Sequence, residues 1–261
     1  MKKTVLITGG NGYIAKSIHQ YLSSTYTFTS ISRNNFDLTD YDKTCEWFSK
    51  TPYDVVIHTA ISGGSRLSQD DNSVFNNNMA MFDNLVANMH RFSKLITFGS
   101  GAEIFHGDTP YANSKREIAK QILQYPNFYN LRIFGVFDYN ELDSRFIKSN
   151  IIRYLKKEPM VIHFEKIMDF FYMEDLCNLV DYYIETKNPI KEINCSYKRK
   201  NTLSDICNVI NNLSDYKVPI LINDKNKFDF YCGQSELPID TMGIEKGILE
   251  TFKKLENKLL F

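Results

Sequence analysis

The sequence has no excess of charge of either sign, because 31 Lys and Arg residues balance 31 Asp and Glu residues. A nucleic-acid-binding protein needs a basic surface that neutralises phosphates, so this balance argues against a nucleic-acid partner. The sequence also lacks an apolar run of the roughly 18 residues that a membrane span needs. The apolar share is 43%, and no long run of one charge occurs, which argues against a disordered chain.

Cysteine is scarce and widely spaced. The chain has five cysteines, none in a Cys-x-x-Cys pair, and its five histidines form no metal-ligand pair with them. This pattern indicates free thiols and argues against a disulfide framework or a zinc site. The apolar stretch after Met1-Lys2-Lys3 is too short for the core of a signal peptide. We therefore expect a soluble, cytoplasmic protein without a metal or a membrane partner.

Strand-like and helix-like segments alternate through the first half of the chain. The expected strands are Thr4–Thr8, Thr27–Ser32, Asp54–His58, Lys94–Phe98 and Asn127–Phe134. The expected helices are Tyr13–Ser24, Tyr41–Lys50, Ser73–Arg91 and Pro110–Gln124. Such alternation predicts an α/β fold with a Rossmann-type, doubly wound parallel sheet covered by helices on both faces.

The alternation becomes irregular after about Phe137. Further helices are expected at Arg145–Lys156, Glu174–Glu185, Leu203–Asn212 and Gly243–Leu260, and short strands at Met160–His163, Glu192–Cys195 and Val218–Ile222. We expect residues 1–137, with returning segments near 160–195, to form the Rossmann core. Residues 138–261 are expected to form mainly a small, mixed α/β C-terminal lobe.

A glycine-rich turn joins the first strand to the first helix. Gly9 and Gly12 lead into Ala15 with the spacing Gly-x-x-Gly-x-x-Ala. Glycines let a backbone approach a diphosphate, and a helix N-terminus supplies N–H groups and a positive dipole. The spacing alone also fits an ordinary turn, but its place at the start of an alternating chain favours an NAD(P) site that includes Tyr13 and Ile14.

The end of the second strand bears on the choice of cofactor. An acidic residue there would bind the ribose hydroxyls of NAD, whereas this chain has Ser32 and Arg33. Arg33 can pair with a 2′-phosphate, which favours NADP(H) over NAD(H), although a solvated surface arginine is the alternative. Asp37 and Leu38 follow at a place where the adenine edge could be read.

Tyr111 and Lys115 lie four residues apart on one expected helix. Tyr183 and Lys187 have the same spacing, so the context has to separate the two pairs. Only the first pair follows a strand that ends near a serine, Ser100, at the edge where such sheets bind ligands. A carbonyl that receives a hydride needs a proton, which a tyrosine beside an ammonium can supply, while a serine hydroxyl holds the oxygen. The three residues therefore predict carbonyl reduction, with Lys115 also holding the nicotinamide ribose.

These residues resemble the extended short-chain dehydrogenase/reductase family that acts on nucleotide sugars. The resemblance covers nearly the whole chain and includes Met168–Asp175, which is similar to the family's Arg-Asp-Phe segment, and Gly243–Ile248. It implies that Thr59, Ala60 and Asn78 lie at the cofactor. It also implies a nucleotide-sugar substrate and a homodimer that pairs through the helix at 73–91 and the helix of Tyr111.

Within that family the pattern is most similar to 4-keto sugar reductases of the GDP-L-fucose synthase type, through residues 32–40, 63–79 and 94–100. This resemblance implies NADPH-dependent reduction of the C4 ketone of a nucleotide-linked 4-keto-6-deoxy sugar, in activated deoxysugar and polysaccharide biosynthesis. The substrate-binding residues that it implies are Gly63, Gly64, Gly101, Ala102, Glu103 and Arg145.

The chain also departs from the family in ways that bear on the reaction. Epimerising members carry Cys where this chain has Ala102 and His in the segment of Arg145, so we expect reduction without epimerisation. A register shift of one residue would put Glu103 in the acid position of the dehydratases. An NAD-dependent 4-epimerase or a 4,6-dehydratase is therefore the alternative function. A non-catalytic NADP-binding sensor is a third, against which the joint presence of a Ser, a Tyr and a Lys argues.

Overall fold

The computed structural model describes residues 2–64, 69–105 and 107–259. The chain forms two compact units. The first runs up to Arg132 and takes back Cys177–Ile193, and the second contains Ile133–Leu176 and the chain from Asn194 onward. The segment that returns to the first unit is shorter than the segment expected near 160–195. The first boundary between the two units lies between residues 132 and 133, whereas the sequence suggested 137 and 138.

The first unit is built on a six-stranded parallel sheet with the strand order β2-β1-β3-β4-β5-β9. Its strands are β1 (Thr4–Thr8), β2 (Thr27–Ile31), β3 (Tyr53–His58), β4 (Phe92–Ser100), β5 (Phe128–Ile133) and β9 (Glu192–Cys195). From β1 the chain proceeds first to one side and then to the other, which leaves a crevice at the carboxyl ends of β1 and β3. The predicted doubly wound Rossmann-type sheet is confirmed.

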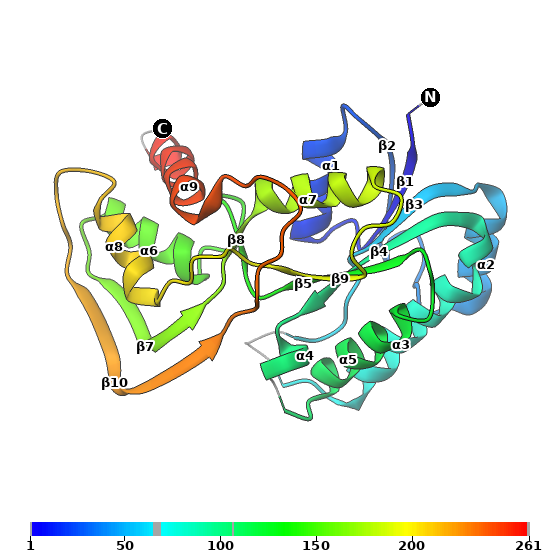
Figure 1. The fold of residues 1–261 in the computed structure, drawn as a ribbon, viewed down its shortest axis with the longest axis horizontal. Coiled ribbons are helices and arrows are strands. Elements are labelled where there is room, and N and C mark those ends of the chain that lie inside the picture. The colour runs from blue at the N-terminus through cyan, green and yellow to red at the C-terminus, as the bar shows by residue number, and fades with distance from the viewer. Residues whose placement is uncertain (1, 65–68, 106, 260–261) are drawn as a thin grey trace. The chain divides into compact units, whose positions relative to one another are not determined.

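Helices cover both faces of this sheet, with α1 and α7 on one face and α2, α3 and α5 on the other (Figure 1). They are α1 (Tyr13–Leu22), α2 (Tyr41–Lys50), α3 (Asn72–Ala87), α5 (Pro110–Ile122) and α7 (Met173–Glu185). The helix predicted at 73–91 ends early, and a 3₁₀ turn, η1 (Met89–Arg91), follows it. It ends at Asn88, whose side-chain amide donates to the Asn84 carbonyl and whose backbone N–H donates to Leu85.

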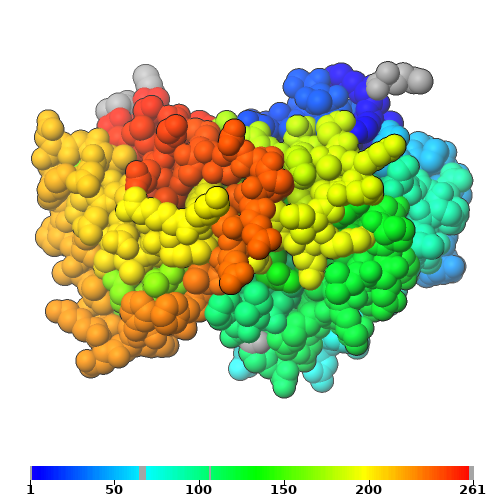
Figure 2. Space-filling view, in the orientation of Figure 1, coloured from blue at the N-terminus to red at the C-terminus, as the bar shows by residue number. Residues whose placement is uncertain are grey.

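The second unit contains β6 (Val136–Phe137), α6 (Phe146–Leu155), β7 (Met160–Met168), β8 (Phe171–Tyr172), α8 (Leu203–Asn211), β10 (Ile220–Tyr231) and α9 (Gly243–Leu259). In this unit, α6 and α8 pack against β7 of a two-stranded parallel ribbon, and α9 packs on α6, α8 and β8. Strand β10, orange in Figure 2, is much longer than the predicted Val218–Ile222. The sequence analysis ended this strand too early because polar residues interrupt its apolar pattern. At these residues the strand is irregular, and its register against β7 shifts between Asp224 and Phe228.

Strand β4 positions the candidate site. It extends beyond the predicted Lys94–Phe98 at both ends and is buried along nearly its whole length, because helices cover both sides of the sheet. Its last residue is Ser100. The residues at its carboxyl end therefore belong to the edge at which a sheet of this type binds ligands. Within the described ranges, no helix is both long enough and apolar enough to span a bilayer.

Candidate active site

In the turn after β1, the backbone of Gly9 lies close to the backbone of Ala60. Gly9 has a φ of 68°, and a Cβ on it would lie 2.7 Å from the amide nitrogen of Ala60. The N–H of Gly12 donates to the Gly9 carbonyl at 2.8 Å, and no side chain caps α1. Only glycine fits this conformation without strain. The dipole at such a helix start favours an anionic group, as a diphosphate site requires.

A pocket of about 350 Å³ lies against this turn. Eight predicted cofactor residues line it: Gly9, Gly12, Ser32, Arg33, Asp37, Leu38, Thr59 and Ala60. Tyr13, Ile14 and Asn78 are not among its lining residues. Sequence reasoning missed Thr8, Asn11, Ile31, Phe36, Ile61 and Met81. Most of these are apolar and read as ordinary core residues until the fold brings them to the crevice.

Asp37 and Arg33 are charged residues that line the pocket, and they differ in their hydrogen bonds. The Asp37 carboxylate accepts hydrogen bonds from the backbone N–H of Thr39 at 3.0 Å and from its hydroxyl at 2.9 Å. These bonds lower the pKa of Asp37 and hold it in its own turn. Arg33 is exposed and is the cation among the described lining residues. The electrostatics of this rim are therefore suited to an additional phosphate.

Ser100 is the first residue of a short capping arrangement. Its hydroxyl oxygen accepts the N–H of Ala102 at 3.2 Å, and its own N–H donates to the Glu103 carboxylate at 2.8 Å. Helix α4 (Ala102–Phe105) begins there. Ser-x-x-Glu is the sequence signature of a capping box, so residues 100–103 carry a signal that the sequence analysis did not use.

Helix α5 brings Tyr111 and Lys115 to the end of β4. Thr109 caps the helix by accepting the N–H of Ala112 at 3.2 Å. The Lys115 ammonium donates to the carbonyl of Phe98 at 2.6 Å and lies 5.9 Å from the centre of the Tyr111 ring. Lys115 is therefore anchored two residues before Ser100 on the same strand.

Burial governs the charge of Lys115. It lowers the pKa of this ammonium to about 8, and the Glu103 carboxylate acts in the opposite direction. His58, on β3, is buried nearby, and desolvation together with the Lys115 charge lowers its pKa to about 3. His58 is therefore neutral at physiological pH, and Glu103 is the anion that acts on Lys115.

The loop after β3 packs on the tyrosine. Gly63 and Gly64 have φ values of 74° and 72°, and a Cβ on Gly64 would lie 2.7 Å from the Tyr111 ring. The N–H of Gly64 donates to both carboxylate oxygens of Asp70, at 3.0 and 3.1 Å. Gly64 thus packs closely on Tyr111, whereas Gly63 packs against Val74 and Asp70. The predicted contact of the two glycines with substrate stays a prediction.

Asn78 forms hydrogen bonds with Ser62 in the same loop after β3. Its buried side chain accepts the N–H of Ser62 at 2.8 Å, donates to the Ser62 carbonyl at 3.0 Å and donates to the Ser114 hydroxyl at 3.0 Å. These contacts are with protein groups, so Asn78 joins the loop to α5. Its expected contact with the cofactor stays a prediction.

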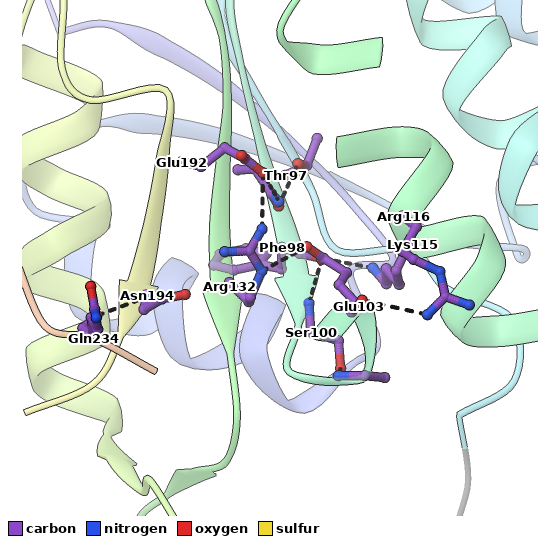
Figure 3. A network of polar contacts seen from close by, with 12 residues as sticks. Thr97, Phe98, Ser100, Glu103, Lys115, Arg116, Arg132, Glu192, Asn194 and Gln234 are labelled. Carbon is purple, nitrogen blue, oxygen red and sulfur yellow. Dashed lines mark hydrogen bonds and ion pairs between the residues drawn. The ribbon is translucent and has the colours of Figure 1, made fainter. Parts of the chain in front are cut away.

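The other predicted substrate residues are spread over both units. Gly101 and Ala102 are buried beside Ser100. The Glu103 side chain points inward and pairs with Arg132 at 2.7 Å, as Figure 3 shows. Arg145 lies in the second unit at the N-cap of α6, half exposed and 4.0 Å from the Glu141 carboxylate. Sequence reasoning missed Arg132 because its partner is 29 residues away in the chain.

A glycine turn on the first βα unit of a doubly wound sheet, with a Ser, a Tyr and a Lys at the end of β4, defines a class of enzymes that depend on a nicotinamide dinucleotide. Residues 5–196 match the model of the NAD dependent epimerase/dehydratase family. The chain belongs to this family and is an NAD(P)-dependent oxidoreductase of the nucleotide-sugar group. The resemblance inferred from the sequence is thereby confirmed.

Solved structures share the fold at low identity. A GDP-L-fucose synthetase from Naegleria fowleri bound to NADP is 17% identical, with a TM-score of 0.77 over 98% of this chain and 94% of that one. GDP-mannoheptose C4 reductase from Campylobacter jejuni with NADP bound is 14% identical, with a TM-score of 0.80 over 98% of each chain. UDP-N-acetylglucosamine 4-epimerase from Methanobrevibacter ruminantium is 20% identical, with a TM-score of 0.78 over 99% and 100%. A comparison with curated protein sequences gives no significant match.

Proposed function

We propose that this protein uses NADPH to reduce the C4 ketone of a nucleotide-linked 4-keto-6-deoxy sugar to the alcohol, without epimerisation. The observation that carries this proposal is the grouping of Ser100, Tyr111 and Lys115 at the carboxyl end of β4. The similarity to solved structures of a GDP-L-fucose synthetase and a GDP-mannoheptose C4 reductase supports the choice of substrate class.

The residues of the first unit fit the cofactor. Gly9 lets the turn after β1 pack against the backbone of Ala60, and no side chain caps the start of α1, whose dipole favours a diphosphate. Arg33 would pair with the 2′-phosphate, and Thr59 and Ala60 line the same pocket. When bound, the cofactor supplies the hydride that adds to the carbonyl carbon.

The chain's own residues handle the proton. The O–H bond of Tyr111 breaks and its proton passes to the carbonyl oxygen, so that ketone, NADPH and one proton from solvent become alcohol and NADP⁺. Lys115 stabilises the tyrosinate that remains. The Ser100 oxygen accepts the N–H of Ala102, which leaves the hydroxyl proton to donate to the substrate oxygen.

The decisive measurement is NADPH oxidation against GDP-, dTDP-, CDP- and UDP-linked 4-keto-6-deoxy sugars, with NADH in parallel. We expect turnover with one nucleotide and a product whose C3 and C5 configurations match those of the substrate. Tyr111→Phe should lower kcat by a factor of about 10² to 10⁴ and leave cofactor affinity within twofold, because it removes only the proton donor. Absence of turnover across the panel, with NAD(H) retained in the purified protein, would refute the proposal.

That negative outcome would favour the 4-epimerase or 4,6-dehydratase alternative, in which the cofactor is recycled. The dehydratase requires an acid–base group that faces substrate. The Glu103 carboxylate is bound by the N–H of Ser100 and by Arg132 and is almost fully buried, which favours the reductase. The direct test is whether incubation of a nucleotide hexose without added cofactor yields a keto product.

The expected homodimer and the cytoplasmic location are further parts of this proposal. Helices α3 and α5 lie side by side on one face of the sheet, and Leu123 next to them is about half exposed. Pairing through these helices predicts a dimeric mass in sedimentation equilibrium. It also predicts that Leu123→Glu shifts the protein toward the monomer.

A further inference from the structure

The loop that follows β4 carries a carboxylate that hardly reaches the surface. The Glu103 side chain is only 4% exposed. One of its oxygens accepts the N–H of Ser100 at 2.8 Å, and the other accepts from Arg132 Nε at 2.7 Å (Figure 3). Glu103 therefore connects the residue that holds the substrate oxygen in the proposed function to a cation on β5.

Arg132 is itself held from two strands. Its Nη2 donates to Glu192 at 3.0 Å, and the Asn130 side chain donates to the same carboxylate oxygen at 3.2 Å. The Arg132 side chain is 14% exposed. A buried carboxylate is destabilising unless a cation or hydrogen-bond donors compensate its charge. Arg132 is the cation that pairs with Glu103, and Glu192 on β9 helps to keep Arg132 in place.

Strand β4 has a glycine, Gly99, at the position that faces this carboxylate. A Cβ on Gly99 would lie 2.3 Å from a carboxylate oxygen of Glu103 and 2.6 Å from the side-chain oxygen of Asn130. Approaches this short are not possible, so the Glu103 carboxylate and any larger residue at 99 exclude each other. The buried ion pair therefore depends on residues of three elements, which are Gly99 in β4, Glu103 in α4 and Arg132 in β5.

The same carboxylate acts on the lysine. The Lys115 ammonium donates to the carbonyl of Phe98, which precedes Ser100 by two residues. The ionisable groups that act on Lys115 are Glu103 from α4, the neutral His58 from β3, and Tyr111 one turn earlier on α5. Arg116 donates to the backbone carbonyl of Glu103 at 3.4 Å. The Glu103 charge is thus the anion that opposes the effect of burial on Lys115.

We propose that Glu103, paired with Arg132, is a positioning residue that fixes Ser100 and supports Lys115 in proton transfer from Tyr111. Glu103 acts through these residues and does not itself exchange protons with the substrate. This inference rests on the proposed function for its kinetic readout. It also makes a prediction about cofactor binding alone, because a charged Lys115 is what would hold the nicotinamide ribose.

Glu103→Gln is the main test, because it keeps the shape and the acceptor for the Ser100 N–H while removing the charge. Removal of an opposite charge at this range lowers a lysine pKa by about one unit or more. We expect the alkaline limb of the kcat/KM profile to move down by about one pH unit, and kcat at neutral pH to fall about tenfold. KM for the sugar should stay within about twofold, because Glu103 does not touch it.

Cofactor affinity supplies a second readout that does not need turnover. Trp47 is the single tryptophan and packs at a tilt against Phe36, a lining residue of the pocket, with ring centres 5.5 Å apart. Energy transfer from Trp47 to bound NADPH therefore reports binding. For E103Q we expect affinity close to that of the wild type at pH about 6 and a loss that begins about one pH unit earlier on the alkaline side.

Two further variants separate positioning from a general loss of structure. Arg132→Gln removes the cation that pairs with Glu103, so the carboxylate loses this contact and holds Ser100 less firmly. R132Q should therefore lower kcat at neutral pH by about tenfold and keep the alkaline limb of the wild type, because Glu103 is still present beside Lys115. Glu117→Gln removes a carboxylate from α5 two residues after Lys115 and is the matched control, for which we expect an unchanged profile.

The outcomes are distinct. A folded E103Q with the pH profiles of the wild type would overturn the inference. So would an E103Q that loses turnover by more than about 10³-fold at every pH but binds cofactor normally, because that result would make Glu103 the acid–base group. If E103Q does not fold, a folded R132Q with the kcat of the wild type would overturn it instead. If the wild type turns over no sugar of the panel, the proposed function fails, and the cofactor-binding profiles still decide the role of Glu103.

Discussion

Arg33 is the residue whose chemistry is most closely tied to the choice of cofactor. A guanidinium offers a planar fork of donors that matches a phosphate, and it stays charged at any physiological pH. It is exposed at the pocket rim, where the neighbouring Asp37 is engaged by Thr39 and is not directed at a ribose. A charge-assisted hydrogen bond of this kind contributes about 1.5–3 kcal/mol.

We therefore expect Arg33→Ala to lower kcat/KM for NADPH by a factor of about 10 to 100. The value for NADH should change less than about threefold, because NADH has no 2′-phosphate. Steady-state kinetics with the two cofactors measures both. Lys43→Ala removes an exposed cation from the adjacent α2 and should leave the NADPH-to-NADH ratio unchanged. An equal loss with the two cofactors would show that Arg33 does not read the phosphate.

The place of Arg33 and of the glycine turn at the pocket could be predicted from the sequence, because each comes just after a strand, β2 or β1. Gly9 has to be glycine for a local reason, its left-handed φ. The Glu103–Arg132 pair could not be identified in this way, because a buried ion pair leaves no periodic trace and its partners are far apart in the chain. Ser100 and Glu103 did carry a local signal, the capping box, which indicates a helix start without revealing that a cation lies beneath it.

Among the elements, α9 shows how a buried carboxylate fixes a helix end. Asp175 lies in the first turn of α7, is fully buried, and accepts the N–H of Met242 at 2.8 Å and that of Gly243 at 3.1 Å. The Tyr197 hydroxyl donates to the same carboxylate. The segment Met168–Asp175 was matched to the family as a sequence pattern, and within the second unit the structure gives its last residue a structural role: it holds the start of α9.

We expect Asp175→Asn to lower the free energy of unfolding by about 2–4 kcal/mol, because an amide group would face buried N–H donors that need an acceptor. Urea unfolding at neutral pH, followed by circular dichroism, measures the change. Asp240→Asn, an exposed carboxyl close to the start of α9, is the control and should stay within about 0.5 kcal/mol of the wild type. If the two variants were equally stable, the Asp175 contacts would have no energetic role.

The length of an element was predictable only where its pattern is regular. Thr4–Thr8, Tyr41–Lys50 and Glu192–Cys195 have their predicted bounds, since an apolar run or a capped amphipathic turn marks both ends. Strand β10 was cut short at Ile222 because the polar stretch after it breaks the alternation of a strand. The two-residue strands β6 and β8 are too short to produce any periodic signal.

For the molecule as a whole, the parallel sheet could be predicted because its strands are apolar on both faces, whereas its helices are apolar on one face only. What periodicity does not encode is which buried groups are held neutral and which are held charged. His58 is such a group, because it follows five residues of the buried strand β3 and is only 7% exposed. The Thr8 hydroxyl accepts the Ala60 N–H and shares a hydrogen bond of 2.8 Å with His58 Nδ1.

This buried histidine gives the protein an acid-sensitive stability. Its pKa is lowered to about 3 by burial and by the charge of Lys115, whereas an unfolded histidine titrates near its ordinary value of about 6.5. Between these values the unfolded chain binds a proton that the native chain does not, so stability is complete above pH about 6.5 and declines as the pH falls. The slope for one group is at most about 1.4 kcal/mol per pH unit.

We expect the free energy of unfolding to fall by about 2 kcal/mol between pH about 6.5 and 4.5, measured by urea titration at each pH. His58→Asn keeps an acceptor for the Thr8 hydroxyl and removes the titrating group, so it should flatten this slope even if its stability at neutral pH is lower. His90→Asn, at an exposed position on η1, is the matched control and should retain the slope. An H58N variant as acid-sensitive as the wild type would assign the slope to the carboxylates, whose own contribution begins below pH about 5 because their pKa values are lower.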